Sequence, residues 1–389
     1  MSKDINVINL AEYKQPDIIE SNRNEWVEFG EGQSYFQFLI DRHLKSATNN
    51  AVINNITRLI YGKGLTALDG NKKPEQFAQL MTLINADDLR NVCGELKLLG
   101  QAALQVHYSK DRKKILKAYH IPVHLLAPEK CDENGDIRGY YYSNNWSDIK
   151  KYKPELIDAF GFGKGEVEIL YIKPYSVGMK YYSYVDYIGG LPYASLEEEI
   201  SDYLINDVQN GFAPTMIVNF NGGTGTEEQR AETERKANAK LTGSKGKKII
   251  YSFNKNKENV TTVDAIPLND APEHYQYLAE ECMRKILVAH NVTSPLLFGI
   301  ATTTGFSSNA DELKNSLLIF DNLVIRPFQE LIISAIEKIL QYNGITLRLA
   351  FKSLNPFEDV NAVVENNNTQ NTTLSSQEID LSEFGEIIN

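Results

Sequence analysis

The stretch of this sequence that comes nearest to a chemical motif is residues 243–248, which read GSKGKK. Glycine-rich loops that end in lysine bind phosphate groups, because their backbone N–H groups converge on the anion. A true phosphate loop has four residues between its glycines and a serine or threonine after its lysine. Here two residues separate Gly243 from Gly246, and Lys248 follows Lys247. The spacing argues against a nucleotide site, and an enzyme driven by nucleotide or acting on nucleic acid through this loop is kept as an alternative.

Histidine, carboxylate and cysteine spacings are also unlike those of catalytic or metal sites. His120 and His124 are four residues apart, but Pro122 between them disfavours the helix that would align two imidazoles. The adjacent carboxylates at 197–199 and 280–281 point in different directions on a helix, so we interpret them as solvated or as partners of basic groups. Three widely separated cysteines exclude a disulfide framework and favour a reducing compartment. We therefore predict no catalytic residues, no metal and no cofactor, and hence a protein that is not an enzyme.

Charge is distributed unevenly along the chain. Its 40 basic and 51 acidic residues give a formal net charge of -11, which disfavours a generally basic nucleic-acid binder. Between residues 230 and 257, however, nine basic residues face only two acidic ones. This segment is either a solvated face or a surface that meets an acidic protein or a polyanion. The candidate contact residues are Arg235, Lys236, Lys240, Lys245, Lys247 and Lys248.

A second anomaly is the stretch 291–310, which contains no charged residue. It is too rich in hydroxyl side chains, and too interrupted by Pro295 and two glycines, to span a membrane. A long neutral loop between helices either packs on a neighbour as an ordinary connection or has a specific task. The residues that would carry such a task are Ala301, Thr302, Thr303, Thr304, Ser307, Ser308 and Asn309.

The first half of the chain predicts helices followed by short strands. Apolar residues at three- and four-residue spacings predict a helix over 46–60 and a second helix over 74–99. Residues 101–128 alternate apolar and polar side chains around a turn at 109–111, which is typical of a hairpin, and further short strands are expected up to residue 193. The fold class predicted for this part is α+β.

The second half predicts three helices around a small insert. Ser195 and Glu198 form a capping box for a helix that ends at 210–211, and its apolar face would be Leu196, Ile200, Tyr203, Leu204 and Val208. A second helix starts near Asp270, and a third runs from about residue 308 to 342 with a kink at Pro327. Between the first two helices, strands at 215–220, 248–253 and 260–264 enclose a polar helix at 226–240. Residues 353–389 carry seven acids and no base, and they are expected to be disordered.

Taken in order, these elements resemble the portal proteins of tailed bacteriophages, which form the ring that connects head and tail. The residues that carry the resemblance are NGFAP at 210–214, VTSPLLFG at 292–299, the FSSN loop at 306–309 and Pro327 within the last long helix, with a weaker match over 99–128. The resemblance covers roughly residues 45–345.

The resemblance implies a division of the chain into functional parts. These are an N-terminal arm (1–45), an α+β wing (46–194), a first stem helix (195–212), a small βαββ clip (213–269), a second stem helix (270–292), a tunnel loop (293–310), a kinked helix returning to the wing (311–352) and an acidic tail (353–389). Little sequence remains for a crown.

The resemblance also implies a function. Such a protein forms a ring, usually of twelve copies, at one vertex of the capsid, and sequence-independent double-stranded DNA is packaged and ejected through its channel. Implied partners are the large terminase subunit, head-completion adaptors and the major capsid protein, in the virion and, during assembly, in the host cytoplasm, with no membrane. A neutral tunnel loop fits this role, because cationic side chains would hold DNA phosphates by counterion release. Another ring-forming virion adaptor is the remaining alternative.

Overall fold

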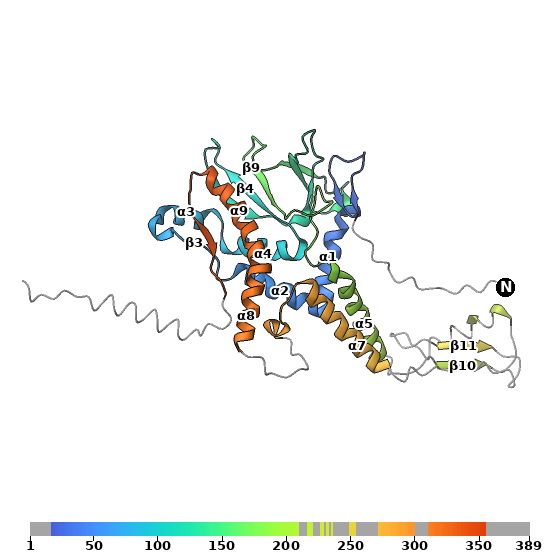
Figure 1. Cartoon of the computed structure of the whole chain (residues 1–389). Coiled ribbons are helices and arrows are strands. Elements are labelled where there is room, and N and C mark those ends of the chain that lie inside the picture. Colours follow the sequence, from blue (N-terminus) through green and yellow to red (C-terminus); the bar gives the residue numbers. More distant parts are fainter. Residues whose placement is uncertain are drawn as a thin grey trace, which may run out of the picture.

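The computed structural model describes residues 17–209, 216–220, 226–228, 231–232, 235, 249–253, 271–299 and 310–354. Its main body combines a helical layer with small antiparallel sheets, and a pair of helices extends from one side of that body (Figure 1). The α+β class predicted from the sequence is therefore confirmed. Within the described part of the chain, no helix has both the length and the apolarity needed to cross a membrane.

The helical layer consists of α1 (Ser34–Lys45), α2 (Ala47–Tyr61), α3 (Pro74–Leu83) and α4 (Ala86–Leu99). The helix predicted over 46–60 is confirmed, and the Ser46 side chain caps it by accepting a hydrogen bond from the Asn49 amide. The single helix predicted over 74–99 was wrong. Ile84 is extended, and Asn85 caps a new helix by accepting a hydrogen bond from the Asp88 amide. An N-cap inside an apolar pattern divides the helix without changing its periodicity.

Two three-stranded antiparallel sheets form the rest of the main body. In the first, β4 (Ala102–Tyr108) lies between β5 (Ile115–His120) and β9 (Val167–Ile172), which confirms the predicted hairpin. In the second, β7 (Gly139–Tyr142) lies between β6 (Leu126–Pro128) and β8 (Glu155–Asp158). Two further pairs join β1 (Ile18–Ile19) to β2 (Glu28–Phe29) and β3 (Leu65–Ala67) to β12 (Leu349–Phe351). The second of these pairs ties the end of the described chain to the helical layer.

The last long helix is a composite of three segments. It comprises α8 (Ala310–Phe320), a π-helical segment (Asp321–Ile325) and α9 (Arg326–Tyr342), which follow one another as a continuous rod in Figure 1. Pro327, where a kink was predicted, lies in the first turn of α9 directly after the π-helical segment. Proline has no N–H to donate, and a π-helical segment is one way in which a helix accommodates the missing bond. Buried residues of α9, such as Ile336, share one core with α2, α4 and β4.

The extended helix pair consists of α5 (Leu191–Gln209) and α7 (Ala271–Ala289). The capping box predicted at Ser195 was wrong: α5 begins at Leu191, and the Ser195 hydroxyl donates to the Leu191 carbonyl inside the helix. A 3₁₀ turn (Ile188–Gly190) leads directly into α5, and Pro192 occupies the first helical turn, where its missing N–H costs nothing.

Beyond α5 and α7 in Figure 1 lie two of the predicted clip strands, β10 (Met216–Phe220) and β11 (Ile249–Phe253). They pair in parallel from Met216 with Ile249 to Phe220 with Phe253. Parallel neighbouring strands need a crossover connection between them, and the predicted order of strand, helix and strand would supply one. The third strand predicted at 260–264 lies outside the described residues. Of the predicted polar helix at 226–240, the described residues 227–228, 231–232 and 235 are helical and exposed.

Candidate functional site: the stem root and the flanks of the neutral loop

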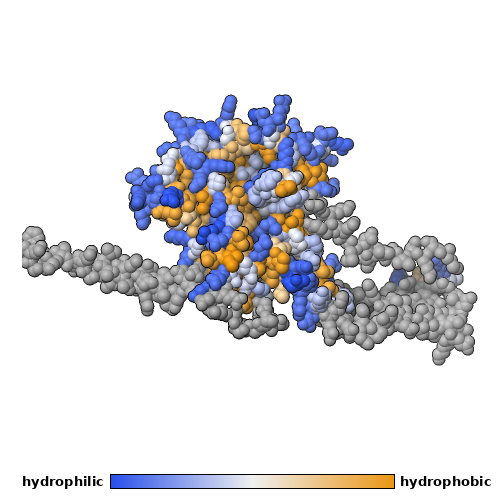
Figure 2. Space-filling model, viewed as in Figure 1, coloured by the Kyte–Doolittle hydropathy of each residue, from blue (hydrophilic) through white to orange (hydrophobic). Residues whose placement is uncertain are grey.

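The paired helices α5 and α7, together called the stem, leave several of their large apolar side chains exposed to solvent. Tyr203 stacks on Tyr275 across the pair at a ring distance of 4.5 Å. On α7, Cys282 and Ile286 are buried, but Tyr277 and Val288 are each 63% exposed. The surface around the stem and α8 is correspondingly apolar in Figure 2.

The apolar face predicted for α5 is mostly exposed. Ile200 alone among its described members is buried, whereas Leu196, Tyr203 and Leu204 are exposed, and the side chain of Val208 is outside the described part. Exposed apolar side chains that gather on one helix face are typical of a protein–protein contact.

The stem root is the end of the stem that joins the body, at residues 186–200 and 286–292. Gly190 lies directly against α7 there, because a Cβ atom added at Gly190 would come within 2.8 Å of the Ala289 Cβ. Any larger residue would push the two helices apart. The Gly189-Gly190 pair, which the sequence marks only as a turn, therefore also permits close packing of the stem root.

Two carboxylates of α5 hold the stem root to the helical layer. Glu198 forms salt bridges with Arg42 (2.5 Å) and Lys45 (2.7 Å) at the end of α1. Glu197 lies over the N-terminus of α2, where it accepts hydrogen bonds from the Ser46 hydroxyl, the Thr48 amide and the Thr48 hydroxyl (2.7 Å). A carboxylate at a helix N-terminus is favoured by the unpaired N–H groups and by the helix dipole. The interpretation of these acids as partners of basic groups is thus confirmed for Glu198.

Glu197→Ala is expected to lower the free energy of unfolding by about 1–2 kcal/mol, because it removes an anion and hydrogen-bond acceptor from the α2 N-terminus. The matched control is Glu199→Ala, since Glu199 is an exposed carboxylate of the same helix. Urea unfolding followed by circular dichroism measures the difference. Equal stability of the two variants would show that the Glu197 contacts contribute nothing.

A buried polar cluster lies behind these carboxylates. The Lys97 ammonium group is fully buried and donates to both carboxylate oxygens of Asp186, at 2.8 and 2.7 Å. It also lies over the rings of Tyr187 (5.2 Å) and Phe328 (5.5 Å). Burial lowers the pKa of Lys97, and the Asp186 charge and hydrogen bond oppose that change. One lysine of α4 thus contacts the segment entering α5 and the first turn of α9.

The Tyr187 ring also contacts His290, the residue that follows α7. The ring of Tyr187 stacks on His290 at 4.4 Å, and His290 Nε2 donates to the Asn49 side-chain oxygen at 2.9 Å. Burial, with a smaller effect of the Lys97 charge, lowers the pKa of His290 well below its usual range, so the imidazole is neutral at physiological pH. These contacts therefore fix the end of α7 against α2 and, through Tyr187 and Lys97, against α4.

The two flanks of the neutral loop pack on one another. After α7, a short 3₁₀ helix (Pro295–Phe298) ends at Gly299, whose φ of 72° is typical of glycine. Phe298 meets Phe320 of α8 edge to face at 5.7 Å, and the Thr293 hydroxyl donates to the Ser316 carbonyl at 2.9 Å. The segment that precedes the neutral loop therefore packs on the helix that follows it.

Solved structures with a similar fold come from a gene transfer agent particle. The chain matches one in the virion of a native gene transfer agent particle at 14% identity and a TM-score of 0.54, covering 90% of this chain and 91% of that one. It also matches a chain in the neck of the native particle, computed with C12 symmetry, at 14% identity and a TM-score of 0.52, covering 89% and 90%. The chain has the fold of this particle's neck component.

A further match is an HK97-family phage portal protein from Corynebacterium diphtheriae, at 12% identity and a TM-score of 0.42, covering 80% of this chain and 93% of that one. No family model matches the sequence, and no curated protein matches it significantly. At this identity the likeness to the gene transfer agent chains shows the fold, which is that of a neck component.

The structure describes few of the site residues predicted from the sequence. Arg235 is exposed on a helical turn of the insert. The other predicted contact residues of the insert, Lys236, Lys240, Lys245, Lys247 and Lys248, lie outside the described residues. The same holds for the predicted loop residues Ala301, Thr302, Thr303, Thr304, Ser307, Ser308 and Asn309. Among the described side chains, no three His, Cys, Asp or Glu residues gather as a metal site would require.

Sequence reasoning missed the residues that position the stem. Lys97 follows Cys93 by four residues, on the apolar side of its helix, and a lysine at such a position signals a buried charge with a partner. Its partner, Asp186, is 89 residues away in sequence, so no local spacing reveals it. His290 is buried and its Nε2 contacts the Asn49 side chain, which is a structural role.

Proposed function

We propose that this chain is a portal subunit, whose copies form a ring at one capsid vertex and conduct double-stranded DNA during packaging and ejection. The observation that carries the proposal is the fold shared with a neck chain over about nine-tenths of both chains. The ordered sequence pattern of stem, clip, neutral loop and proline-containing helix supports it independently. The protein acts as a structural conduit in the virion, without catalysis of its own.

The exposed stem supports ring formation. Apolar side chains such as Leu204 and Tyr277 lie open along helices whose other faces are packed. In a closed ring each subunit presents two different faces to its two neighbours, and these contacts bury such side chains. Twelve subunits are proposed, in keeping with the C12 symmetry applied to the similar neck.

The other parts take the roles expected of a portal. The insert at 213–269, with its basic residues, is the proposed contact for the terminase motor and later for head-completion adaptors. The loop at 293–310 is proposed to face DNA in the channel. Because that loop has no lysine or arginine, DNA passing it releases no counterions and is not held.

Ring formation tests the proposal directly. Purified wild-type protein is expected to form rings in negative-stain microscopy, with a central hole wide enough for duplex DNA, and light scattering should give a matching oligomer mass. Leu204→Asp, which introduces a charge on the open stem face, should reduce the ring fraction about tenfold or more, since burying an unpaired charge costs several kcal/mol. The control Leu68→Asp alters a leucine away from the stem that is also exposed (69%, against 44% for Leu204). Wild-type protein that stays monomeric at high concentration would refute the proposal.

A further inference from the structure

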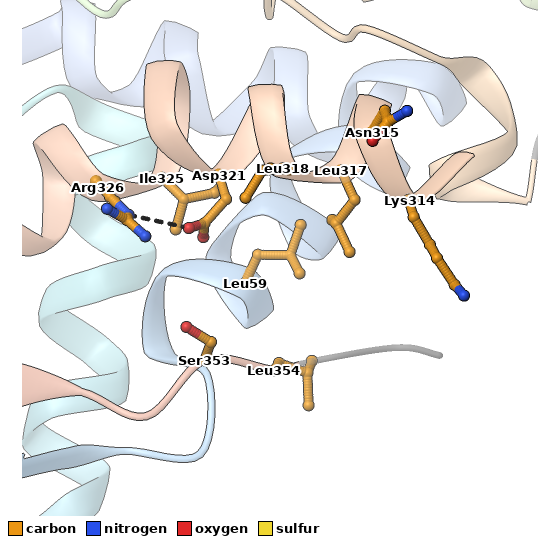
Figure 3. A pocket seen from close by; sticks show the side chains of 10 residues that line it. All are labelled: Leu59, Lys314, Asn315, Leu317, Leu318, Asp321, Ile325, Arg326, Ser353 and Leu354. Atoms are coloured by element: carbon orange, nitrogen blue, oxygen red, sulfur yellow. Dashed lines mark hydrogen bonds and ion pairs between the residues drawn. The ribbon is translucent and has the colours of Figure 1, made fainter. Parts of the chain in front are cut away.

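A groove of about 420 Å³ lies between α2, α8 and the end of the described chain (Figure 3). Its floor and walls are mostly leucine and isoleucine, from Leu59 of α2, Leu317 and Leu318 of α8, and Ile325. Ser353 and Leu354, the last described residues, form its remaining side. The groove is open: Leu318 is 57% exposed although it lies among other apolar side chains.

The rim of the groove is more basic than acidic. Lys314 and Arg326 lie at its two ends, and Asp321 between them pairs with Arg326 at 3.1 Å. Lys314 is exposed, and its side chain extends along the open side of the groove in Figure 3. An occupant that complements this rim carries apolar side chains for the floor and carboxylates for the rim.

Backbone hydrogen bonds hold the end of the described chain beside this groove. The Lys63 amide donates to the Lys352 carbonyl at 2.8 Å, and the Lys352 amide donates to the Gly64 carbonyl at 2.9 Å. Gly62 has a φ of 57°, and a Cβ atom there would meet the Lys352 oxygen. Residue 352 is thus held against the end of α2, and residues 353 and 354 lie in the groove.

The sequence that follows complements the groove. Residues 355–365 read NPFEDVNAVVE. Asparagine followed by proline, with glutamate three positions after the asparagine, is a typical start signal for a helix. Phe357, Val360 and Val364 follow at the i, i+3 and i+7 positions of one helical face, and Glu358 and Asp359 lie on another. The segment therefore combines apolar side chains with carboxylates.

The volume of the groove and the length of chain between Leu354 and Phe357 also fit this segment. A cavity of about 150 Å³ holds a benzene molecule, so 420 Å³ accommodates one phenyl ring and neighbouring aliphatic side chains. Phe357 is three residues from Leu354, and three residues extend over about 10 Å. We infer that residues 355–365 of the same chain dock in the groove between α2 and α8, with Phe357 among the leucines and the acids toward Lys314. The segment would thereby brace the helix that follows the neutral loop.

Hydrogen–deuterium exchange of the full-length chain tests this inference. Phe357→Ala is expected to raise amide exchange in α8 and in residues 355–365 about tenfold, because it removes most of the apolar area that holds the segment. The matched control is Phe384→Ala, which alters a phenylalanine of the same tail outside the proposed segment. Leu318→Asp, from the groove side, should raise exchange of residues 355–365 to the same extent.

Three outcomes would overturn the inference. The first is unchanged exchange in Phe357→Ala. The second is an equal rise in β4, which is far from the groove and would report general destabilisation. The third is protection that depends on protein concentration in the ring-deficient Leu204→Asp variant, which would mean that a second copy supplies the segment. Because the measurement does not require ring formation, this inference can fail while the proposed function holds, and the reverse.

Discussion

Asp186→Ala should lower the free energy of unfolding by about 2–4 kcal/mol. The substitution leaves the Lys97 ammonium group fully buried without its carboxylate partner. Breaking a buried ion pair in this way typically costs about 3–5 kcal/mol. The loss expected here is smaller because the Asp186 side chain is 32% exposed and its charge is partly screened by solvent. Thermal or urea unfolding of the full-length protein measures the loss.

The pH dependence of stability should change in the same variant. Burial lowers the pKa of Lys97 in the folded protein, and removing Asp186 lowers it further. Between the folded pKa and the unfolded value of 10.5, the unfolded state binds more protons, so stability rises with pH. Asp186→Ala should therefore gain stability with increasing alkalinity over a wider pH window than the wild type.

A double variant supplies the control. Lys97→Met combined with Asp186→Ala removes both charges and keeps a long side chain beside Tyr187 and Phe328. It should recover most of the stability lost in the single variant, since apolar replacement of a buried pair is often nearly neutral. A double variant as unstable as Asp186→Ala would mean that packing, and not the unpaired charge, explains the loss.

Local sequence patterns predicted most of the secondary structure. The 46–60 helix and the hairpin around 109–111 depend on neighbouring residues, and each is present. Next to Pro327, where a kink was predicted, the helix has a π-helical segment. The errors have local causes too. Asn85 caps a new helix within an apolar pattern, and the turn at 188–190 starts α5 four residues before the capping box.

The candidate site was less predictable because its contacts join distant parts of the chain. Glu197 caps α2 across roughly 150 residues of sequence, and His290 meets Asn49 across 241. Periodicity also shows which residues of a helix are apolar but not what covers them. The exposed Leu204 and Tyr277 therefore became informative only when the structure showed them unburied.

Deletion of residues 301–308 is expected to leave ring assembly intact and to impair DNA packaging or retention. Both flanks of the deleted segment are held by their own contacts, Thr293 to Ser316 and Phe298 to Phe320, so the helices keep their places without it. The measurements are ring formation by negative-stain microscopy and nuclease-protected DNA in particles assembled with the variant. Loss of rings would show instead that the loop is structural.

A variant that keeps the loop length but adds charge tests whether the neutral character of the loop matters for DNA passage. Thr302→Lys, Thr303→Lys and Thr304→Lys together place cations where the native loop offers hydroxyl groups. If this loop faces DNA, the added lysines should slow its passage, and the defect should weaken with salt. Six to ten phosphate contacts lose about 10³–10⁵ in affinity between 50 and 200 mM salt. Serine at the same three positions is the neutral control. Normal packaging by the lysine variant at low salt would place the loop away from the DNA path.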